Sequence, residues 1–226
     1  SFTLKSLASN LKANQTVADA QSGATLTITR ASADASRPGE VKYMKPDANA
    51  TAVTVPDTVD LYGVPYKVTA VEANAFKGNK KVQSVVISAS VKSIDKDMFN
   101  GCTALKKVKM PATITMIGDN AFKNCKSLTE IAIPDAVTKI GKSAFYGCKS
   151  LQSVTIPSSV TSIGMSCFYD CTELVDYQLY WETPPVTWNS SLMPNNTDTY
   201  FTIPQGTTAN YTAQNFPSDK LIERSE

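Results

Sequence analysis

Residues 133–155 read IPDAVTKIGKSAFYGCKSLQSVT, and this unit of 23 residues decides the fold. Its apolar positions recur at the same spacing in five consecutive blocks, and no insertion separates any two of them. The blocks span residues 64–86, 87–109, 110–132, 133–155 and 156–178. One position holds phenylalanine in every block: Phe76, Phe99, Phe122, Phe145 and Phe168. A fixed period of this length is typical of a solenoid, in which each coil contacts only its neighbours.

Each coil contains one segment with the alternation of a β-strand. Leu128, Ile131 and Ile133 follow the L-x-x-L-x-L spacing of a leucine-rich repeat, in which alternate side chains point inward. Pro134 ends the strand because it lacks the N–H group that a ladder requires. One coil cannot cover its own apolar face, so coils stack with parallel strands about 4.8 Å apart. The sequence therefore predicts a right-handed leucine-rich repeat solenoid with one parallel strand per coil and short turns or helical turns on the other side.

The second half of each coil is predicted to turn back toward the next strand. Val137 and Ile140 place two further apolar side chains in the core, and Gly141 permits the chain to turn. Asp119 or Ser143 is suited to capping a short helical turn. Such a turn would bury Ala121-Phe122 after Asp119, or Ala144-Phe145 after Ser143.

Cysteine and histidine content restrict the chemistry available to the chain. There is no histidine, which removes Ser-His-Asp and Cys-His nucleophiles and His-ligated metals. The cysteines are Cys102, Cys125, Cys148, Cys167 and Cys171, and four of them repeat at the period of 23 residues. Side chains in such a column point in parallel, which is poor geometry for a disulfide. We interpret the column as a row of small buried thiols, with disulfides between neighbouring coils as the alternative, and we expect no metal site and no cofactor.

The segments before the repeats are predicted to cap the first coil. Residues 1–23 read as a tail or weak helix, with Leu4, Leu7 and Leu11 at helical spacing. Residues 24–63 form a β-rich cap, with candidate strands at 24–30, 40–44 and 52–56 and a turn at Tyr62-Gly63. The first strand edge and the open end of the core both require such a cover.

The segment after the repeats, 179–226, is predicted to be a capping extension. An extended break at 180–185 is followed by a strand at 200–204, a turn at 205–206 and a short helix from Thr208 to Phe216. Exposed tryptophans can stack on a sugar ring, but Trp181 and Trp188 are better interpreted as a plug over the open end of the core.

Basic residues are concentrated in the repeats. The whole chain carries 22 basic and 20 acidic residues, a balance that does not point to nucleic acid. Residues 71–171 hold 13 lysines, no arginine and 7 acids, a net charge of +6, against −4 for the rest of the chain. Lys80, Lys126 and Lys149 share one repeat position. They form either a solvated rim or a strip that attracts an acidic partner, whose binding would weaken with salt.

The outward positions of the predicted strands supply the other candidate binding residues. These are Lys107, Lys109, Glu130, Ser153, Thr155, Asp176 and Gln178. A catalytic site would need a carboxylate pair or an activated thiol in a cleft. The nearest carboxylate pair on the repeats, Asp95 and Asp97, lies with Lys92 and Lys96 and is interpreted as a solvated charge cluster. We therefore expect no enzyme activity.

The fourth block identifies a family resemblance. Read from Ile133 to Val154, it matches the motif I-P-x-x-V-x-x-I-G-x-x-A-F-x-x-C-x-x-L-x-x-V, and the chain resembles the BspA-like leucine-rich repeat proteins. The first two coils depart from the motif at Glu72, Asn79, Ser88 and Asp95. The resemblance implies a secreted or cell-surface protein, frequent in host-associated bacteria and present in some parasitic protists, with a role in adhesion or host-protein binding. It implies no catalytic residues.

Two functions follow as hypotheses. The first is an adhesion module that recognises a host or matrix protein, or an acidic glycan, through the solenoid surface. The second is a stalk or spacer of a surface protein without a ligand of its own. No stretch approaches the roughly 18 apolar residues of a membrane helix, and we expect a monomer. Because the chain starts at Ser1, we expect that a signal sequence has been removed and that the protein is extracellular.

Overall fold

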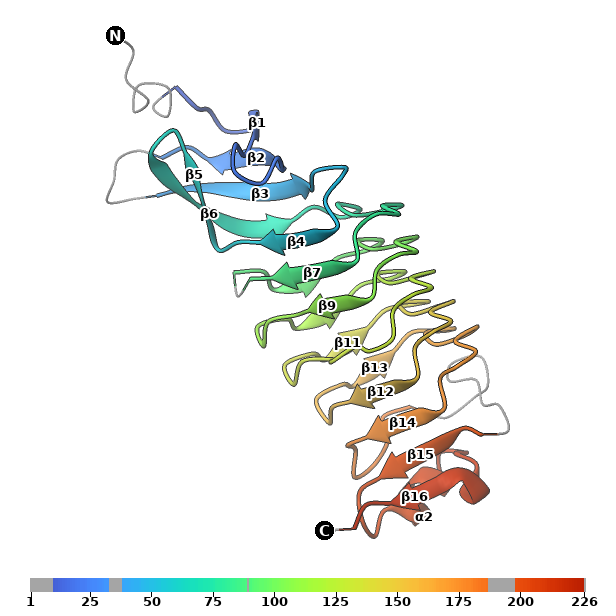
Figure 1. Ribbon diagram of the computed structural model, residues 1–226. Helices are drawn as coiled ribbons and strands as arrows, with labels where there is room; N and C mark the ends of the chain where they lie inside the picture. Colours follow the sequence, from blue (N-terminus) through green and yellow to red (C-terminus); the bar gives the residue numbers. More distant parts are fainter. Residues whose placement is uncertain (1–9, 33–37, 89, 187–197, 226) are drawn as a thin grey trace.

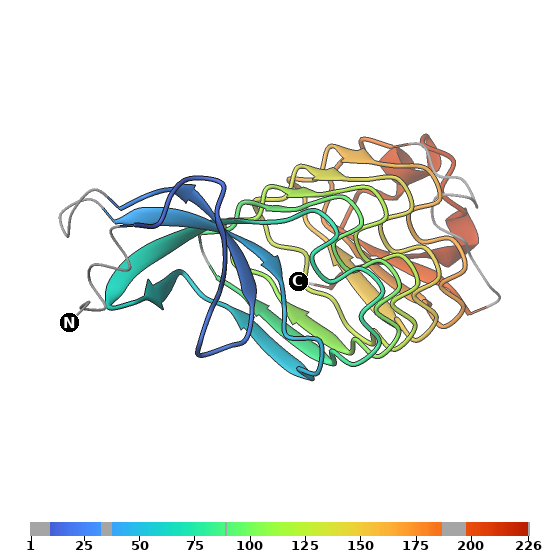
Figure 2. The ribbon, with the colours of Figure 1, turned by 90° about the horizontal axis from the view of Figure 1, so that it is seen from above.

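The computed structural model describes residues 10–32, 38–88, 90–186 and 198–225. The molecule is an elongated stack of coils, with a sheet-rich cap at the N-terminal end and further strands and a short helix at the C-terminal end (Figure 1). Seen from above, successive coils follow one another with nearly the same outline (Figure 2). The predicted leucine-rich repeat solenoid is confirmed.

A parallel ladder runs along one side of the stack, which we call the strand side. Its repeat strands are β7 (Ser84–Ile87), β9 (Lys107–Lys109), β12 (Ser153–Ile156) and β14 (Asp176–Leu179). Equivalent residues of neighbouring coils lie opposite each other, as Val85 does with Val108 and Val154 with Tyr177. The third coil differs, because residues 128–133 form no strand and make only an isolated bridge from Ala132 to Thr155. The prediction of a strand from Leu128 to Ile133 is wrong for this coil.

A second parallel ladder, which the sequence did not predict, runs along the stack at the V-x-x-I positions. Its strands are β8 (Ser93–Ile94), β10 (Met116–Ile117), β11 (Lys139–Ile140) and β13 (Ser162–Ile163). Ile94, Ile117 and Ile140 occupy one column of this ladder and point into the core. The second, fourth and fifth coils therefore each have two strands, one in each ladder.

The third side of each coil, the turn side, is built from turns and not from the predicted helical turn. Two repeat positions have positive φ values, the first in Asn74, Asp97, Asn120, Ser143 and Ser166 and the second in Gly78, Gly101, Asn124, Gly147 and Asp170. Ser143 is thus a left-handed turn residue, and its N–H donates to the Met165 carbonyl of the next coil. The Asp119 carboxylate accepts from the Lys142 N–H of the next coil at 2.8 Å. Neither residue caps a helix.

Backbone hydrogen bonds join neighbouring coils along the turn side. Those between the third and fourth coils run from the N–H groups of Asn120, Phe122 and Asn124 to the carbonyls of Lys142, Ala144 and Tyr146, at 2.9, 2.7 and 2.7 Å. Gly141 lies where the third and fourth coils approach each other closely, since an added Cβ would sit 2.5 Å from the Asp119 nitrogen. Its φ is not positive, so this glycine is required by close packing and not by the turn that the sequence suggested.

Phenylalanine and cysteine columns fill the core behind the turns. The rings of Phe122 and Phe145 stack with centroids 5.2 Å apart and planes within 2°. Each column thiol donates to the phenylalanine carbonyl of the preceding coil, as Cys148 does to Phe122 at 3.1 Å. The equivalent bonds join Cys102 to Phe76, Cys125 to Phe99 and Cys171 to Phe145. All five cysteines are buried and free, so the predicted row of thiols is confirmed and the disulfide alternative is wrong.

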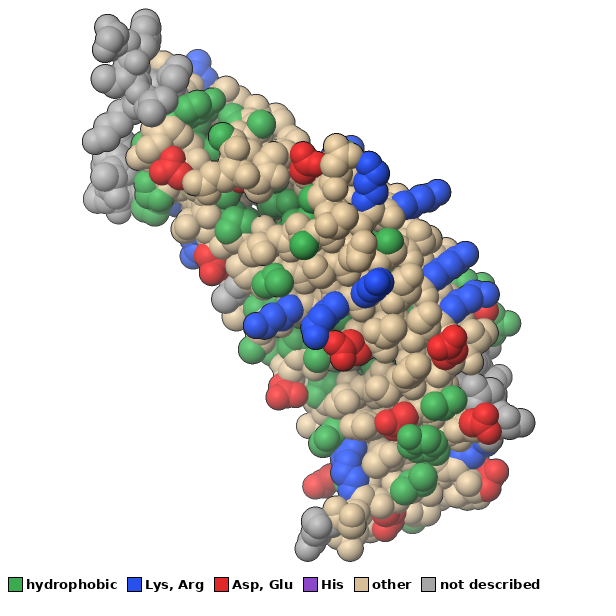
Figure 3. Space-filling model, in the orientation of Figure 1, with side chains coloured by type: hydrophobic (Ala, Val, Ile, Leu, Met, Phe, Trp, Pro, Cys, Tyr) green, Lys and Arg blue, Asp and Glu red, His purple; other side chains and the backbone are tan. Residues whose placement is uncertain are grey.

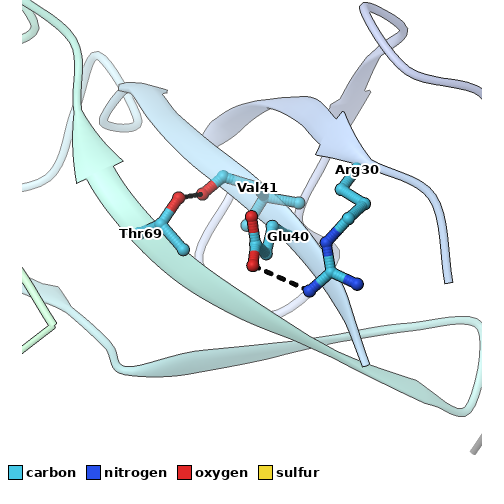
Figure 4. A network of polar contacts seen from close by, with 4 residues as sticks. All are labelled: Arg30, Glu40, Val41 and Thr69. Atoms are coloured by element: carbon cyan, nitrogen blue, oxygen red, sulfur yellow. Dashed lines mark hydrogen bonds and ion pairs between the residues drawn. The ribbon is translucent and has the colours of Figure 1, made fainter. Parts of the chain in front are cut away.

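The N-terminal sheet has five strands in the order β1 (Thr16–Ala18), β2 (Thr25–Arg30), β3 (Gly39–Lys45), β6 (Val64–Val71) and β5 (Thr58–Leu61). It extends beyond the predicted cap of 24–63, because β1 comes from the predicted tail and β6 from the first predicted coil. Figure 4 shows two of its cross-strand contacts, the ion pair of Arg30 with Glu40 at 2.7 Å and the bond from the Thr69 hydroxyl to the Val41 carbonyl. The remaining strand, β4 (Ala52–Val55), leaves this sheet and pairs in parallel with β7. The cap therefore supplies the first rung of the strand-side ladder.

The described part of the predicted N-terminal tail is not helical. Thr16–Ala18 forms β1, which pairs antiparallel with β2, and Leu11 is buried in the core. The helical spacing of leucines indicated a helix, but the alternation at Thr16–Ala18 and the open edge of β2 favour a strand. Leu4 and Leu7 lie outside the described residues.

The C-terminal segment continues the ladder and closes the core. β15 (Tyr200–Ile203) pairs in parallel with β14, and β16 (Leu221–Glu223) pairs in parallel with β15. Between them lie the helix α2 (Thr208–Thr212), shorter than predicted, and a 3₁₀ turn at Ser218–Lys220. Trp181 is buried and donates to the Val160 carbonyl at 2.8 Å, so it is not an exposed ring that could stack on a sugar, whereas Trp188 lies outside the described residues. No described helix is long and apolar enough to cross a membrane.

Candidate partner-binding face

A groove of about 450 Å³ crosses the strand side at the third coil. It lies where that coil lacks a strand, so β9 ends one sheet and β12 begins the next. Five of the predicted binding residues line it: Lys107, Lys109, Glu130, Ser153 and Thr155. Sequence reasoning missed the groove itself and its lining residue Met110.

The groove exists because the ladder between the second and third coils is weakened. In the part of the chain that the structure describes, one backbone bond joins the third coil's residues 128–133 to the second coil at this level, from Thr129 N–H to Lys106 carbonyl at 3.5 Å. That length is at the outer limit of a hydrogen bond. Glu130 and Ala132 take the outward positions of this segment, and both residue types are poor strand formers. This composition was the signal in the sequence that could have indicated the break.

The floor of the groove reaches the hydrophobic core. Val108, Ile131 and Ile133 are 5 to 6% exposed, whereas Val154 and Ile156 at equivalent positions of the next coil are at most 1% exposed. All three of the more exposed side chains line the groove. These three side chains are buried, and the groove reaches them between two polar rims.

Charged side chains form the rim on the β9 side. The Lys107 ammonium and the Glu130 carboxylate are 2.8 Å apart, and both side chains are about two-thirds exposed. An ion pair this accessible adds little to stability and can open at small cost. Lys109 follows two residues later on the same face of β9, is exposed, and has no ion pair among the described residues.

Hydroxyl groups form the opposite rim. Ser153 and Thr155 lie on β12, and the Thr155 hydroxyl is 3.4 Å from Gln178 Oε1. The Gln178 amide donates to Asp176 at 3.0 Å. Asp176 and Gln178 thus stand behind the rim on β14 and do not line the groove. The strand-side candidates therefore form one connected surface across the second to fifth coils.

The lysine strip borders this surface at the point where the chain enters the strands. Lys126 and Lys149 lie on adjacent coils, since the Lys126 carbonyl accepts from the Ser150 N–H, and Lys80 lies two coils before Lys126. All three are exposed. Lys149 is 3.5 Å from Asp170, whereas Lys80 and Lys126 have no ion pair in the described residues. None of the three lines the groove.

Charge is unevenly distributed along the strand side. Figure 3 shows lysine and arginine side chains across the middle of this side, and acidic and apolar side chains toward the C-terminal end. The sequence agrees, because residues 172–226 carry 2 basic and 7 acidic side chains, a net charge of −5. Residues 71–171 and 172–226 therefore carry net charges of opposite sign, +6 and −5.

The carboxylates that were interpreted as a solvated cluster are held in the structure. Asp97 is buried, contrary to that interpretation, and accepts from Asn100 at 2.7 Å and from Lys77 at 3.4 Å. Burial disfavours its charge, but the Asn100 bond and the Lys77 ammonium outweigh this and hold the pKa of Asp97 below its ordinary value. Asp95 accepts from the Ser93 hydroxyl instead. The two carboxylates have separate structural partners.

The buried thiols are not arranged as a reactive site. Burial raises the pKa of Cys102 to about 12 and raises the pKa values of Cys125, Cys148 and Cys167 well above the ordinary thiol value. A thiol with such a pKa is inert at neutral pH. Among the described residues, no group of three or more Cys, Asp or Glu is placed to hold a metal ion.

Comparison with known proteins places the repeats in a family. Residues 63–180 match the family model described as "BspA type Leucine rich repeat region", in six copies. No curated protein matches the chain.

Solved structures show the same fold. The leucine-rich repeat protein TpLRR of T. pallidum is 24% identical with a TM-score of 0.60, over 81% of this chain and 91% of that one. A leucine-rich repeat protein of Bacteroides ovatus is 24% identical with a TM-score of 0.55, and the pneumococcal vaccine antigen PcpA is 15% identical with a TM-score of 0.68. The aligned regions cover 69% and 90% of this chain, respectively, but only 48% and 47% of those two proteins. Since the family model covers more than half of its residues, the chain belongs to the BspA-type leucine-rich repeat family.

Proposed function

We propose that the protein is a cell-surface or secreted binding module that recognises an acidic partner, a host or matrix protein or an acidic glycan, through the strand side and its lysine strip. The observation that carries the proposal is a set of exposed lysines that form no ion pair among the described residues. Lys80, Lys109 and Lys126 have no ion pair in the described residues, and they lie within residues 71–171, whose net charge is +6. Unneutralised charges on a rigid frame attract an oppositely charged partner and orient it.

The family of the repeats and one structural relative support a location outside the cell. The BspA-type repeat resembles those of surface proteins, and one structural relative, PcpA, is named a vaccine antigen. A solenoid also offers an extended surface for a macromolecule without any catalytic group. We therefore propose adhesion, and no enzyme activity, as the role of this module.

The test is a glycan array together with a panel of matrix proteins, followed by charge reversal. The triple variant K80E/K126E/K149E is expected to lower affinity for the captured partner, as is a rise to about 0.5 M salt, because the Debye length there is only a few ångströms. The matched control K12E/K45E/K67E makes the same change in net charge on the N-terminal cap. Both variants should unfold at the temperature of the unmodified protein, since exposed lysines contribute little to stability.

Two outcomes would overturn the proposal. Binding that ignores both the triple reversal and salt would remove the lysine strip as the site. No saturable binding to any member of either panel would favour the alternative, a stalk or spacer, for which the second ladder and the stacked rings provide a stiff frame.

A further inference from the structure

We propose that the groove at the third coil binds the carboxylated sugar unit of an acidic saccharide. The inference rests on the proposed function and names the chemistry of its partner at one site. Three features of the groove, each from a different part of its lining, match the three kinds of surface that such a sugar presents.

The first feature is a cation at one end. Lys109 lines the groove, is exposed, and has no ion pair among the described residues. Lys107 lies two residues before it, so the two side chains leave β9 on the same face. Lys107 forms a solvent-exposed ion pair with Glu130 at 2.8 Å. A ligand carboxylate can replace Glu130 in this pair without leaving a buried charge unpaired. Lys109 is therefore the primary anchor for the carboxylate.

The second feature is a set of hydrogen-bonding groups suited to hydroxyls. Ser153 and Thr155 contribute side chains that both donate and accept, and Glu130 contributes an acceptor. Residues 128–133 form no strand, and their one β-bridge in the described chain joins Ala132 to Thr155, because the ladder is broken there. A sugar ring carries several hydroxyls, each a donor and an acceptor, and can satisfy groups of both kinds.

The third feature is the apolar floor. Ile131, Ile133 and Met110 lie between the two rims, and the floor is more exposed here than at the next coil. The C–H faces of a pyranose ring pack on such a surface. An acidic peptide would use the lysines, but it has fewer groups that match the hydroxyl rim.

The dimensions of the groove agree with this ligand. Its volume of about 450 Å³ lies within the roughly 300–1,000 Å³ of small-molecule sites and is too small for the face of a folded protein. The groove opens to solvent, so one unit can bind while the rest of a chain extends over the neighbouring coils. Beyond the Ser153 and Thr155 rim, a second groove lined by Thr155, Asp135, Ser158 and Tyr180 continues the surface.

The experiment is titration of the full chain with N-acetylneuraminic acid and with a glucuronic acid disaccharide, followed by NMR or calorimetry. The carboxyl methyl ester of each sugar is the matched ligand control. Lys109→Gln is the test variant, and Lys139→Gln, on β11 of the other ladder, is the variant with the same change in charge. We expect the acids to bind the unmodified protein saturably. The affinity should fall at least about tenfold for Lys109→Gln and for the esters, because each removes a charge-assisted hydrogen bond. Lys139→Gln should bind as the unmodified protein does.

A third variant, Thr155→Val, separates hydroxyl recognition from charge. It keeps the shape of the side chain and the net charge but removes one donor and acceptor, and we expect it to weaken sugar binding while leaving thermal unfolding unchanged. Methyl esters that bind as well as the acids, or a Lys109→Gln variant of full affinity, would overturn the proposal. If neither sugar binds but an acidic matrix protein still binds through the lysine strip, the groove proposal fails and the proposed function stands. If nothing binds, both fail.

Discussion

The turn side of the solenoid repeats more regularly from coil to coil than the strand side does. On the turn side, neighbouring coils are joined by backbone hydrogen bonds at one register from the first coil to the fifth, and the centroids of neighbouring phenylalanine rings lie 4.8 to 5.3 Å apart. On the strand side, the outward residues change from coil to coil and the ladder is broken at the third. The turn side carries the architecture, which leaves the strand side free to vary its surface.

The largest expected effect is an alkaline loss of stability that originates on the turn side. Burial raises the thiol pKa values of Cys102, Cys125, Cys148 and Cys167 in the folded state. Stability is therefore complete below the ordinary thiol pKa near 9 and falls as pH rises toward the folded value, about 12 for Cys102, because only the unfolded chain loses these protons. Cys102 alone accounts for about 1 kcal/mol at pH 10, and the other three act in the same direction.

Denaturant titrations at pH 7, 8, 9 and 10 measure this effect. The control is a variant with serine at all four positions, which should lose less stability between pH 8 and pH 10. A stability that is flat across this range would show that the thiols are not sequestered in the core.

Phe145→Ala tests the stacked column directly. Phe145 is fully buried between Phe122 and Phe168, and its removal should cost about 3–5 kcal/mol by leaving a cavity. Tyr169→Ala is the matched control, since this ring is exposed and also stacks on its neighbour, Tyr146. Equal effects of the two variants on denaturant unfolding would contradict the distinction between core and surface rings.

Gly141→Ala tests the close approach of coils next to the turn side. The added methyl would meet the backbone of Asp119 and Gly118 at 2.5 to 2.6 Å, and we expect a loss of about 1–3 kcal/mol. Gly78→Asn is the control, because its position has open space and the equivalent residue Asn124 already adopts positive φ. Thermal unfolding that separates the two variants by only a degree would mean that Gly141 has room for a side chain.

The smallest expected effect is repair of the broken ladder. Glu130→Thr with Ala132→Val replaces poor strand formers with good ones and should stabilise the third coil by up to about 1 kcal/mol. Amide hydrogen exchange is the more sensitive measurement: residues 130–133 should exchange faster than 153–156 in the unmodified protein and at similar rates in the variant. If the amides of 130–133 are already protected, the break in the ladder does not persist in solution.

The repeats show what could be predicted from sequence and what could not. The phenylalanine and cysteine columns were predicted because buried residues at one repeat position must be alike to stack. The thiol-to-carbonyl bonds were not, since a residue type does not reveal which neighbour it faces. The second ladder and the close approach at Gly141 depend on the distance between coils, which composition does not contain. For the candidate site, the outward residues of the strands could be predicted from their alternation. The groove was not predicted, because it arises where strand pairing fails, at Glu130 and Ala132.

The direction of the thiol bonds has a consequence for how such proteins can lengthen. Each of the column cysteines donates backward, to the carbonyl of the coil before it, and its own coil offers the next carbonyl forward. The first coil has Asn79 at this position, whose side chain instead accepts from Lys81 and Val82 of its own coil. Duplication of one whole unit in the gene would therefore add one thiol donor and one carbonyl acceptor, so every thiol would keep a partner. Duplication of a fragment would interrupt this series of thiol-to-carbonyl bonds.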